Sequence, residues 1–175
     1  MDQRSVLVTG ASRGLGESIS KQLISNGYFV IGTATTERGV DRLEDDLGSS
    51  GFAVKMRIDN AESVRQAYQR IEERCVEMPL ILVNNAGITK DNLMLRMSEE
   101  EWTSVVDTNV NGLYRVTKPI IRAMMKARWG RIVNISSVVA RMGSPGQTNY
   151  ASSKSAVEGF TRALAIEVAS RGITV

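Results

Sequence analysis

Short apolar runs alternate along the chain with longer stretches in which apolar residues recur every three or four positions. The short runs are rich in valine, isoleucine and leucine, which is typical of strands covered on both faces of a parallel sheet. The alternation predicts an α/β protein: a Rossmann-type, doubly wound parallel sheet in a three-layer α/β/α arrangement. The expected strands cover residues 5–9, 28–32, 52–57, 80–84 and 131–136, and the expected helices 15–26, 40–47, 62–76, 99–108, 112–126 and 150–170.

Local signals add detail to this pattern. Ser98 followed by Glu101 matches a capping box at the start of a helix. Gly130 lies where a helix is expected to end, and Pro119 is expected to bend or restart the helix that contains it. Residues 173–175 have the pattern of a sixth strand that the sequence only begins.

Composition narrows the class of protein. The 175 residues, 42% of them hydrophobic, fit one domain over residues 1–175. A net charge of +3 without a basic block predicts no nucleic-acid partner, and no segment approaches the ~20 apolar residues of a membrane span. Histidine is absent, so a Ser-His-Asp triad and a His-ligated metal site are excluded, and no metal is expected. Cys75 is the only cysteine, which favours a reducing cytoplasm.

A glycine-rich turn follows the first expected strand and opens the first expected helix. Gly10 permits a tight exit from the strand, Gly14 lets backbone approach a phosphate, and Gly16 lets the helix pack close to the sheet. The amino end of the helix then offers N–H donors to a pyrophosphate. A purely structural turn is the alternative, but the strand–turn–helix context favours a dinucleotide. The expected cofactor contacts along the turn are Gly10, Ser12, Arg13, Gly14, Leu15 and Gly16.

The ends of the next strands indicate which dinucleotide binds. An NAD site usually places an acid after the second strand, whereas residues 32–36 contain none. Arg13 and Arg38 could meet a 2′-phosphate there, which predicts NADP(H), although either arginine could simply be solvated. Asn84 is expected to brace neighbouring strands. The cofactor contacts expected at the ends of the third and fourth strands are Asp59, Asn60, Asn85, Ala86 and Gly87.

A tyrosine and a lysine supply the candidate chemistry. Tyr150 and Lys154 are four residues apart and share one face of a helix. A free tyrosine has a pKa of about 10, and an ammonium about 5 Å away would stabilise its phenolate by roughly 3 kcal/mol. Tyr150 would then act as the acid, with Lys154 tuning it and holding the nicotinamide ribose. Both Tyr150 and Lys154 are also expected to contact the cofactor. Ser137 could hold a substrate carbonyl and Asn109 a water that replaces the proton, although chance spacing explains each of these residues singly.

Together these residues resemble the short-chain dehydrogenase/reductase family. The motifs that carry the resemblance are Thr9-Gly10-x-x-x-Gly14-x-Gly16, Asn84-Asn85-Ala86-Gly87, Asn109, Ser137 and Tyr150-x-x-x-Lys154. Residues 87–93, 122–125, 146–150 and 169–175 are most similar to the 3-oxoacyl-[acyl-carrier-protein] reductases of bacterial-type fatty acid synthesis.

The resemblance implies an NADPH-dependent reduction of a 3-oxoacyl thioester. The implied catalytic set is Asn109, Ser137, Tyr150 and Lys154, and Thr35 falls at the 2′-phosphate position. An acyl-CoA, a sugar, a steroid or a small ketone stays open as the substrate. A nucleotide-binding fragment without catalysis, which could assemble with full-length subunits, stays open as the function.

The resemblance also implies partners. Arg128 and Arg171 match basic positions that dock the acidic acyl carrier protein, although both could be ordinary solvated arginines. The helices over 109–126 and 150–170 carry apolar stripes, and some of this surface is expected to pair with a second subunit, as in a homotetramer. The stripe residues are Leu113, Val116, Ile120 and Met124 on the first helix and Val157, Phe160 and Leu164 on the second. Family members continue past the sixth strand with a substrate lid and a final strand, so the fold is expected to lack its last part.

Overall fold

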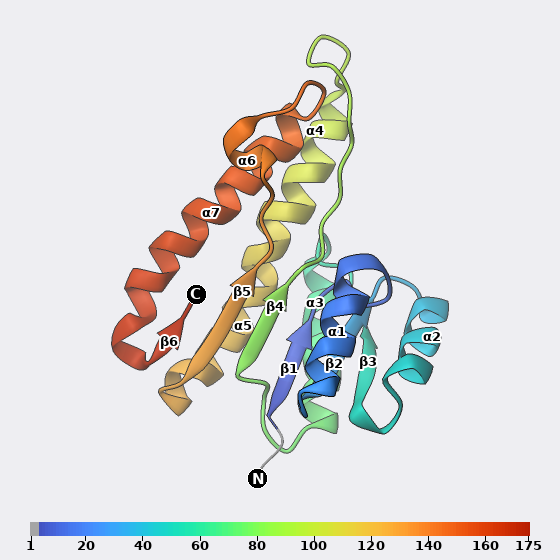
Figure 1. Ribbon diagram of the computed structural model, residues 1–175, viewed down its shortest axis with the longest axis vertical. Coiled ribbons are helices and arrows are strands. Elements are labelled where there is room, and N and C mark those ends of the chain that lie inside the picture. The colour runs from blue at the N-terminus through green and yellow to red at the C-terminus, as the bar shows by residue number, and fades with distance from the viewer. Residues whose placement is uncertain (1–3) are drawn as a thin grey trace.

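The computed structural model describes residues 4–175, whose six strands form one parallel sheet in the order β3-β2-β1-β4-β5-β6 (Figure 1). The order starts near the centre and proceeds outward in both directions, so the predicted doubly wound sheet is confirmed. The strands are β1 Ser5–Val8, β2 Phe29–Ala34, β3 Gly51–Lys55, β4 Ile81–Asn84, β5 Gly130–Asn134 and β6 Ile173–Thr174.

Helices connect the strands and cover both faces of much of the sheet. They are α1 Gly14–Ser25, α2 Glu37–Leu47, α3 Ala61–Arg74, α4 Glu99–Val106, α5 Gly112–Ala127, α6 Val139–Met142 and α7 Thr148–Val168. Three short helical turns complete the set, namely η1 Gly48–Ser50, the π-helical turn η2 Asp107–Asn111, and η3 Ala169–Arg171. No helix among residues 4–175 is long and apolar enough to cross a membrane.

The core lies in two layers, one on each face of the sheet. Successive side chains of a strand point to opposite faces, so Val6 and Val8 pack with α1 and α2 while Leu7 packs with α3, α5 and α7. The continuous apolar runs of the sequence follow from this burial on two sides. Because all six strands are parallel, their carboxyl ends meet along one edge of the sheet, where a doubly wound sheet binds its ligands.

One face of the sheet is incompletely covered. Figure 1 views the sheet from the side of α1 and α2, and β4 and β5 lie open to the viewer beside these helices. Val133 of β5 points to this side and is 49% exposed. The expectation that every strand is covered on both faces is therefore wrong at β5 among the described residues.

Several local expectations can be compared with the structure. The capping box is confirmed, because the Ser98 hydroxyl accepts the N–H of Glu101 and the Glu101 carboxylate accepts the N–H of Ser98. The helix does not restart at Pro119, since α5 runs through it without interruption. Arg128, not Gly130, takes the left-handed conformation at the end of α5, with φ of 53°. The pattern did not predict η2 or α6.

Tyr68 joins α3 to α5 through the core. Its ring is buried and its hydroxyl donates a hydrogen bond to the carbonyl of Val116, 48 residues away. Burial raises the pKa of Tyr68, so the hydroxyl keeps its proton and stays a donor. This bond adds to the apolar packing between α3 and α5, two of the helices that cover one face of the sheet.

Replacing Tyr68 by phenylalanine should lower the free energy of unfolding by about 1 kcal/mol, the usual net value of such a bond. The ring still fills its site, and the Val116 carbonyl keeps its place in the α5 helix. Urea unfolding would measure the loss, with Tyr114→Phe as the matched control because Tyr114 is exposed on α5. Equal stability of the two variants would contradict the prediction.

Candidate active site

The glycine turn brings α1 against the end of β1. Gly10 and Gly14 have φ of 65° and 58°, which glycine adopts without strain. A Cβ atom at Gly16 would lie 2.1 Å from the carbonyl oxygen of Gly10 and 2.6 Å from Nδ2 of Asn85. Only glycine therefore allows this approach, as the sequence pattern predicted for the packing of the helix.

The amino end of α1 is open to an anion. Side chains cap the amino ends of α2, α3 and α4, namely those of Thr36, Asn60 and Ser98, whereas Arg13 at the start of α1 makes no such bond. Nothing lies within 4 Å of a Cβ built at Gly14, so the space beside the turn is free. These uncapped N–H groups and the open turn fit a pyrophosphate. Leu15 is exposed at the same helix end.

Thr9 and Asn85 hold the turn against β4. The Thr9 hydroxyl accepts the N–H groups of Asn85 and Ala86, each at 3.0 Å, and donates to the carbonyl of Val83. Nδ2 of Asn85 donates to the carbonyls of Thr9 and Gly10 at 2.9 and 3.1 Å. The amide of Asn85 thus braces the glycine turn, whereas the sequence analysis expected a cofactor contact of Asn85 and gave the bracing of strands to Asn84. The contribution of the Thr9 side chain was not predicted.

Asn84 and Asn60 also have structural roles. Nδ2 of Asn84 donates to Oδ1 of Asn134 at 2.8 Å and to the hydroxyl of Thr117 at 3.1 Å, which braces β4 against β5 and α5. Oδ1 of Asn60 accepts the N–H of Ser63 and caps α3, which leaves its Nδ2 as the free donor. Its neighbour Asp59 is paired with Arg57 at 2.8 Å.

The end of β2 presents uncompensated positive charge. Thr35 is exposed directly after the strand. Arg13 and Arg38 are both exposed, and neither forms an ion pair with another residue in the range 4–175. The first acid after the strand, Glu37, is paired with Lys55 at 3.0 Å. A phosphate would therefore meet cations here, and the carboxylate of Glu37 is already paired with Lys55.

Tyr150 and Lys154 lie on adjacent turns of α7, at the carboxyl ends of the strands. Lys154 is only 6% exposed, and its Nζ donates to the carbonyl of Ile135 at 2.7 Å. The same nitrogen lies 5.7 Å from the centre of the Tyr150 ring. Burial lowers the pKa of Lys154, because removal from water disfavours the charged ammonium. No carboxylate among the described residues pairs with the ammonium to offset this effect.

Asn109 lies inside η2 rather than at a helix end. Its Oδ1 accepts the N–H of Ile88 at 2.9 Å, and its Nδ2 donates to the carbonyl of Ile88 at 2.9 Å and to the Ser153 hydroxyl at 3.0 Å. Both Nδ2 hydrogens are used, so the side chain fixes Ile88 instead of presenting a free donor to a water. A Cβ at Gly87 would lie 3.0 Å from Oδ1 of Asn109 and 3.7 Å from Nζ of Lys154, so these three residues meet at one point.

Ser137 lies in the turn between β5 and α6. Its hydroxyl accepts the N–H of Val139 at 3.4 Å, and its side chain is partly exposed. The Ser155 hydroxyl donates to the carbonyl of Ala140 at 2.9 Å, which attaches α6 to α7. Ser137 therefore lies at the same edge of the sheet as Tyr150 and Lys154, as the sequence analysis expected of a residue that follows the fifth strand.

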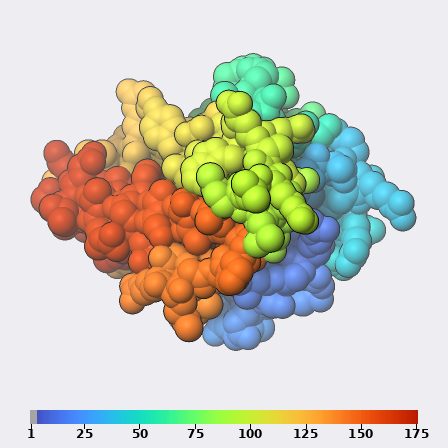
Figure 2. All heavy atoms as spheres, turned by 90° about the horizontal axis from the view of Figure 1, so that it is seen from above, coloured from blue at the N-terminus to red at the C-terminus, as the bar shows by residue number. Residues whose placement is uncertain are grey.

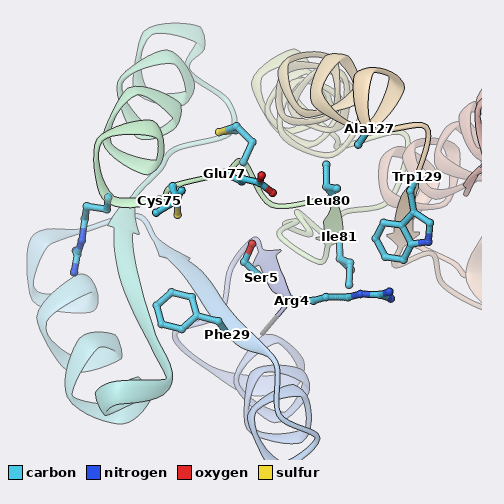
Figure 3. Close-up of a pocket in the computed structure, with 12 residues that line it drawn as sticks. Arg4, Ser5, Phe29, Cys75, Glu77, Leu80, Ile81, Ala127 and Trp129 are labelled. Carbon is cyan, nitrogen blue, oxygen red and sulfur yellow. The ribbon is translucent and has the colours of Figure 1, made fainter. Parts of the chain in front are cut away.

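Two hollows differ greatly in size and position. A cavity of about 790 Å³ opens at the amino ends of the strands, where Arg4, Phe29, Leu80 and Trp129 line it (Figure 3). This is the opposite end of the sheet from Lys154. A hollow of about 10 Å³, room for about one water, is lined by Asn109 and Lys154 among other residues. Asn109 and Lys154 thus border an almost filled space, so the size of a hollow does not identify the candidate site.

Comparison with known proteins agrees with this geometry. A profile of the family described as short chain dehydrogenase matches residues 4–175. A protein named 3-oxoacyl-[acyl-carrier-protein] reductase FabG from Pseudomonas aeruginosa is 52% identical over 172 residues, which are 97% of this chain and 69% of the relative. Proteins of the same name from Vibrio harveyi and Haemophilus influenzae are each 47% identical over the whole chain and 71% and 72% of their own lengths. The chain therefore belongs to the short-chain dehydrogenase family.

Proposed function

We propose that the chain reduces a 3-oxoacyl thioester on acyl carrier protein to the 3-hydroxyacyl form, as an NADPH-dependent oxidoreductase of fatty acid biosynthesis. Relatives with this printed name, about half identical over nearly the whole chain, support the substrate class. The observation that carries the chemistry is the buried ammonium of Lys154, which has no carboxylate partner in the described residues and lies beside Tyr150.

The residues present fit NADP(H). The uncapped amino end of α1 and the turn from Gly10 to Gly16 would hold the pyrophosphate. Thr35, Arg13 and Arg38 would surround the 2′-phosphate, and Gly87 provides a side-chain-free approach to Lys154. When bound, the reduced nicotinamide supplies a hydride to the carbonyl carbon.

The chain's own groups handle the proton and the orientation of the substrate. The Tyr150 hydroxyl donates its proton to the carbonyl oxygen as negative charge develops there. The Lys154 ammonium, whose Nζ lies 5.7 Å from the centre of the Tyr150 ring, would offer a positive charge beside the oxygen that loses this proton. The Ser137 hydroxyl holds the carbonyl oxygen, and Asn109 fixes Ile88 and Gly87 beside Lys154.

Arg128 and Arg171 form the proposed docking surface for the carrier protein. Both arginines are exposed. Nη2 of Arg128, at the end of α5, donates to the carbonyl of Ser170 at 3.4 Å, which brings Arg128 next to the η3 turn that contains Arg171. They precede β5 and β6 and thus occupy the amino ends of these strands. The 21 residues of α7, about 30 Å of helix, separate this surface from Tyr150. The acyl arm must therefore span this length or enter the site of another subunit.

Exposed apolar side chains support assembly with further copies of the chain in the cytoplasm. The expected stripe residues Leu113, Val116, Ile120, Met124 and Val157 are buried in the chain's own core, so they are not free to pair with a second subunit. The apolar side chains exposed on these helices are instead Tyr114 and Met125 of α5 and Ile166 of α7, and Trp102 is exposed on α4. Such side chains are typical of a surface that another subunit covers.

Tyr150→Phe should lower kcat for acetoacetyl thioester by at least about 100-fold, because phenylalanine has no proton to donate. NADPH affinity should be unchanged, and the loss of NADPH absorbance during turnover measures the rate. Tyr114→Phe is the matched control, since Tyr114 lies on α5 outside the site. A Tyr150 variant that still turned over at the control rate would rule out the proposed chemistry.

Thr35→Asp should lower the ratio of kcat/KM for NADPH over NADH by at least about tenfold, because like charges close together cost more than about 1 kcal/mol. Thr36→Asp adds the same charge one residue away, but there the new carboxylate can cap α2 as Thr36 does now. Its ratio should change much less. An unchanged ratio in the Thr35 variant would contradict the assignment of the 2′-phosphate site.

Reversing both charges in Arg128→Glu plus Arg171→Glu should weaken carrier-protein binding by at least about tenfold, through lost attraction and new repulsion. KM for a carrier-linked substrate should rise, while KM for a small acetoacetyl thioester stays constant. Arg65→Glu plus Arg70→Glu on α3 makes the same change of net charge elsewhere on the surface. Equal carrier affinity in the two double variants would exclude the docking surface.

A further inference from the structure

We propose that Asn149 is a positioning residue of the active site, whose side-chain amide sets the Tyr150 turn of α7 against residues 88–97 and against α4. This inference rests on the proposed function for the role of Tyr150 and adds the group that holds Tyr150 in place. The motif analysis singled out the tyrosine and the lysine but gave no role to the residue before the tyrosine.

The amide of Asn149 contacts three different parts of the chain. Its side chain is fully buried, at 0% exposure. Oδ1 accepts the N–H of Tyr150 at 2.7 Å. Nδ2 donates to the carbonyl of Lys90 at 2.8 Å and to the carbonyl of Glu101 at 3.3 Å. Both amide hydrogens and the oxygen are therefore used, and no water is needed to satisfy the group.

The bond to Tyr150 replaces a missing helix cap. The first N–H groups of a helix have no intrahelical partner, and the first such bond in α7 runs from Ala151 to Gln147. Gln147 occupies the cap position but makes no side-chain cap bond. Asn149 therefore satisfies the backbone of the very residue that donates the proton. The orientation of this first turn depends on the amide.

The two donated bonds reach the segment that continues from the cofactor side of the site. Residues 88–97 begin at Ile88, whose backbone Asn109 clamps, and lead to Lys90 two residues later. The same segment meets the loop before α7 at two outer points, Asn92 N–H to Gly146 O and Gln147 Nε2 to Asp91 Oδ2, each at 2.9 Å. Figure 2 shows this yellow-green segment against the orange loop when the molecule is seen from above.

The hydrogen bonds of the buried Asn149 amide differ from the outer bonds between the same segments in whether water can replace them. Water can take over the bond between Gln147 and Asp91, because Asp91 is exposed and Gln147 is not buried. At the buried Asn149 a lost donor leaves the carbonyl of Lys90 without its partner, whereas the carbonyl of Glu101 still accepts the Ser104 hydroxyl. The amide therefore ties the position of Tyr150 to that of the backbone around Gly87, which lines the Lys154 site.

Asn149→Asp separates the two tasks of the side chain. The carboxylate keeps the shape of the amide and still accepts the N–H of Tyr150, but it cannot donate to Lys90 or Glu101. We expect kcat for acetoacetyl thioester to fall about 100-fold through misplacement of the proton donor, with KM and NADPH affinity close to those of the unchanged chain. Gln147→Ala is the matched control, because it cuts an outer bond between the same segments. Its kcat should stay near the original value.

Hydrogen exchange gives a second readout that does not depend on turnover. In Asn149→Asp the N–H of Asn92 should exchange faster, since the segment is released, while the N–H groups of β1 keep their protection. Should this variant fail to fold, Asn149→Ala removes both donors and the acceptor without adding charge, and the same outcomes then test the side chain as a whole.

The results overturn the proposal if kcat falls no further than in Gln147→Ala, or if protection of Asn92 is unchanged. A loss of NADPH affinity as large as the loss of kcat would also overturn it, because the residue would then act on the cofactor fold in general. If the unmodified chain fails to reduce the thioester, the proposed function fails. Hydrogen exchange at the Asn92 N–H then still tests whether Asn149 joins the Tyr150 turn to residues 88–97.

Discussion

The burial of one ammonium group governs the design of the site. An ion removed from water loses several kcal/mol of solvation, and proteins usually offset this with a paired carboxylate. Lys154 has none among residues 4–175 and is held by the carbonyl of Ile135 at the end of β5. The stability of the rest of the fold offsets this loss of solvation free energy. The buried positive charge can then stabilise a nearby phenolate or bind ligand hydroxyls. Burial also lowers the effective dielectric around the ammonium, which strengthens its attraction for an anionic group bound beside it.

Asparagine amides keep the backbone around this charge in place. Asn85 binds carbonyls of the glycine turn, Asn109 binds both backbone groups of Ile88, and Asn149 joins the Tyr150 turn to Lys90. An amide can donate and accept at once without charge, so it pairs with N–H and C=O groups of loops that secondary structure leaves unpaired. Glycines at the cofactor side leave room for backbone approach, and these amides make that backbone rigid.

The sequence predicts what depends on local pattern. The strand positions, the packing of Gly16 and the shared face of Tyr150 and Lys154 follow from periodicity and from the geometry of a helix. The roles of Asn109 and Asn149 could not be derived in this way, because their partners, apart from the Tyr150 N–H beside Asn149, lie 21 to 59 residues away. The left-handed conformation of Arg128 was missed because a glycine two residues later fits the local rule better. The exposure of Val133 was missed because a buried strand and a half-covered one have the same apolar run.

The proposed binding of the carrier protein and the proposed chemistry take place at opposite ends of the sheet. Arg128 and Arg171 gather positive charge at the amino ends of β5 and β6, whereas Tyr150 and Lys154 act at the carboxyl ends, about 30 Å away along α7. Charges this far apart are screened from one another at physiological salt, where the Debye length is about 8 Å. Substitutions at the two ends should therefore affect binding and chemistry independently, and their free energies should add. Capture of an acidic partner can thus change without altering the electrostatics that Tyr150 needs, because only the rigid helix between them is shared.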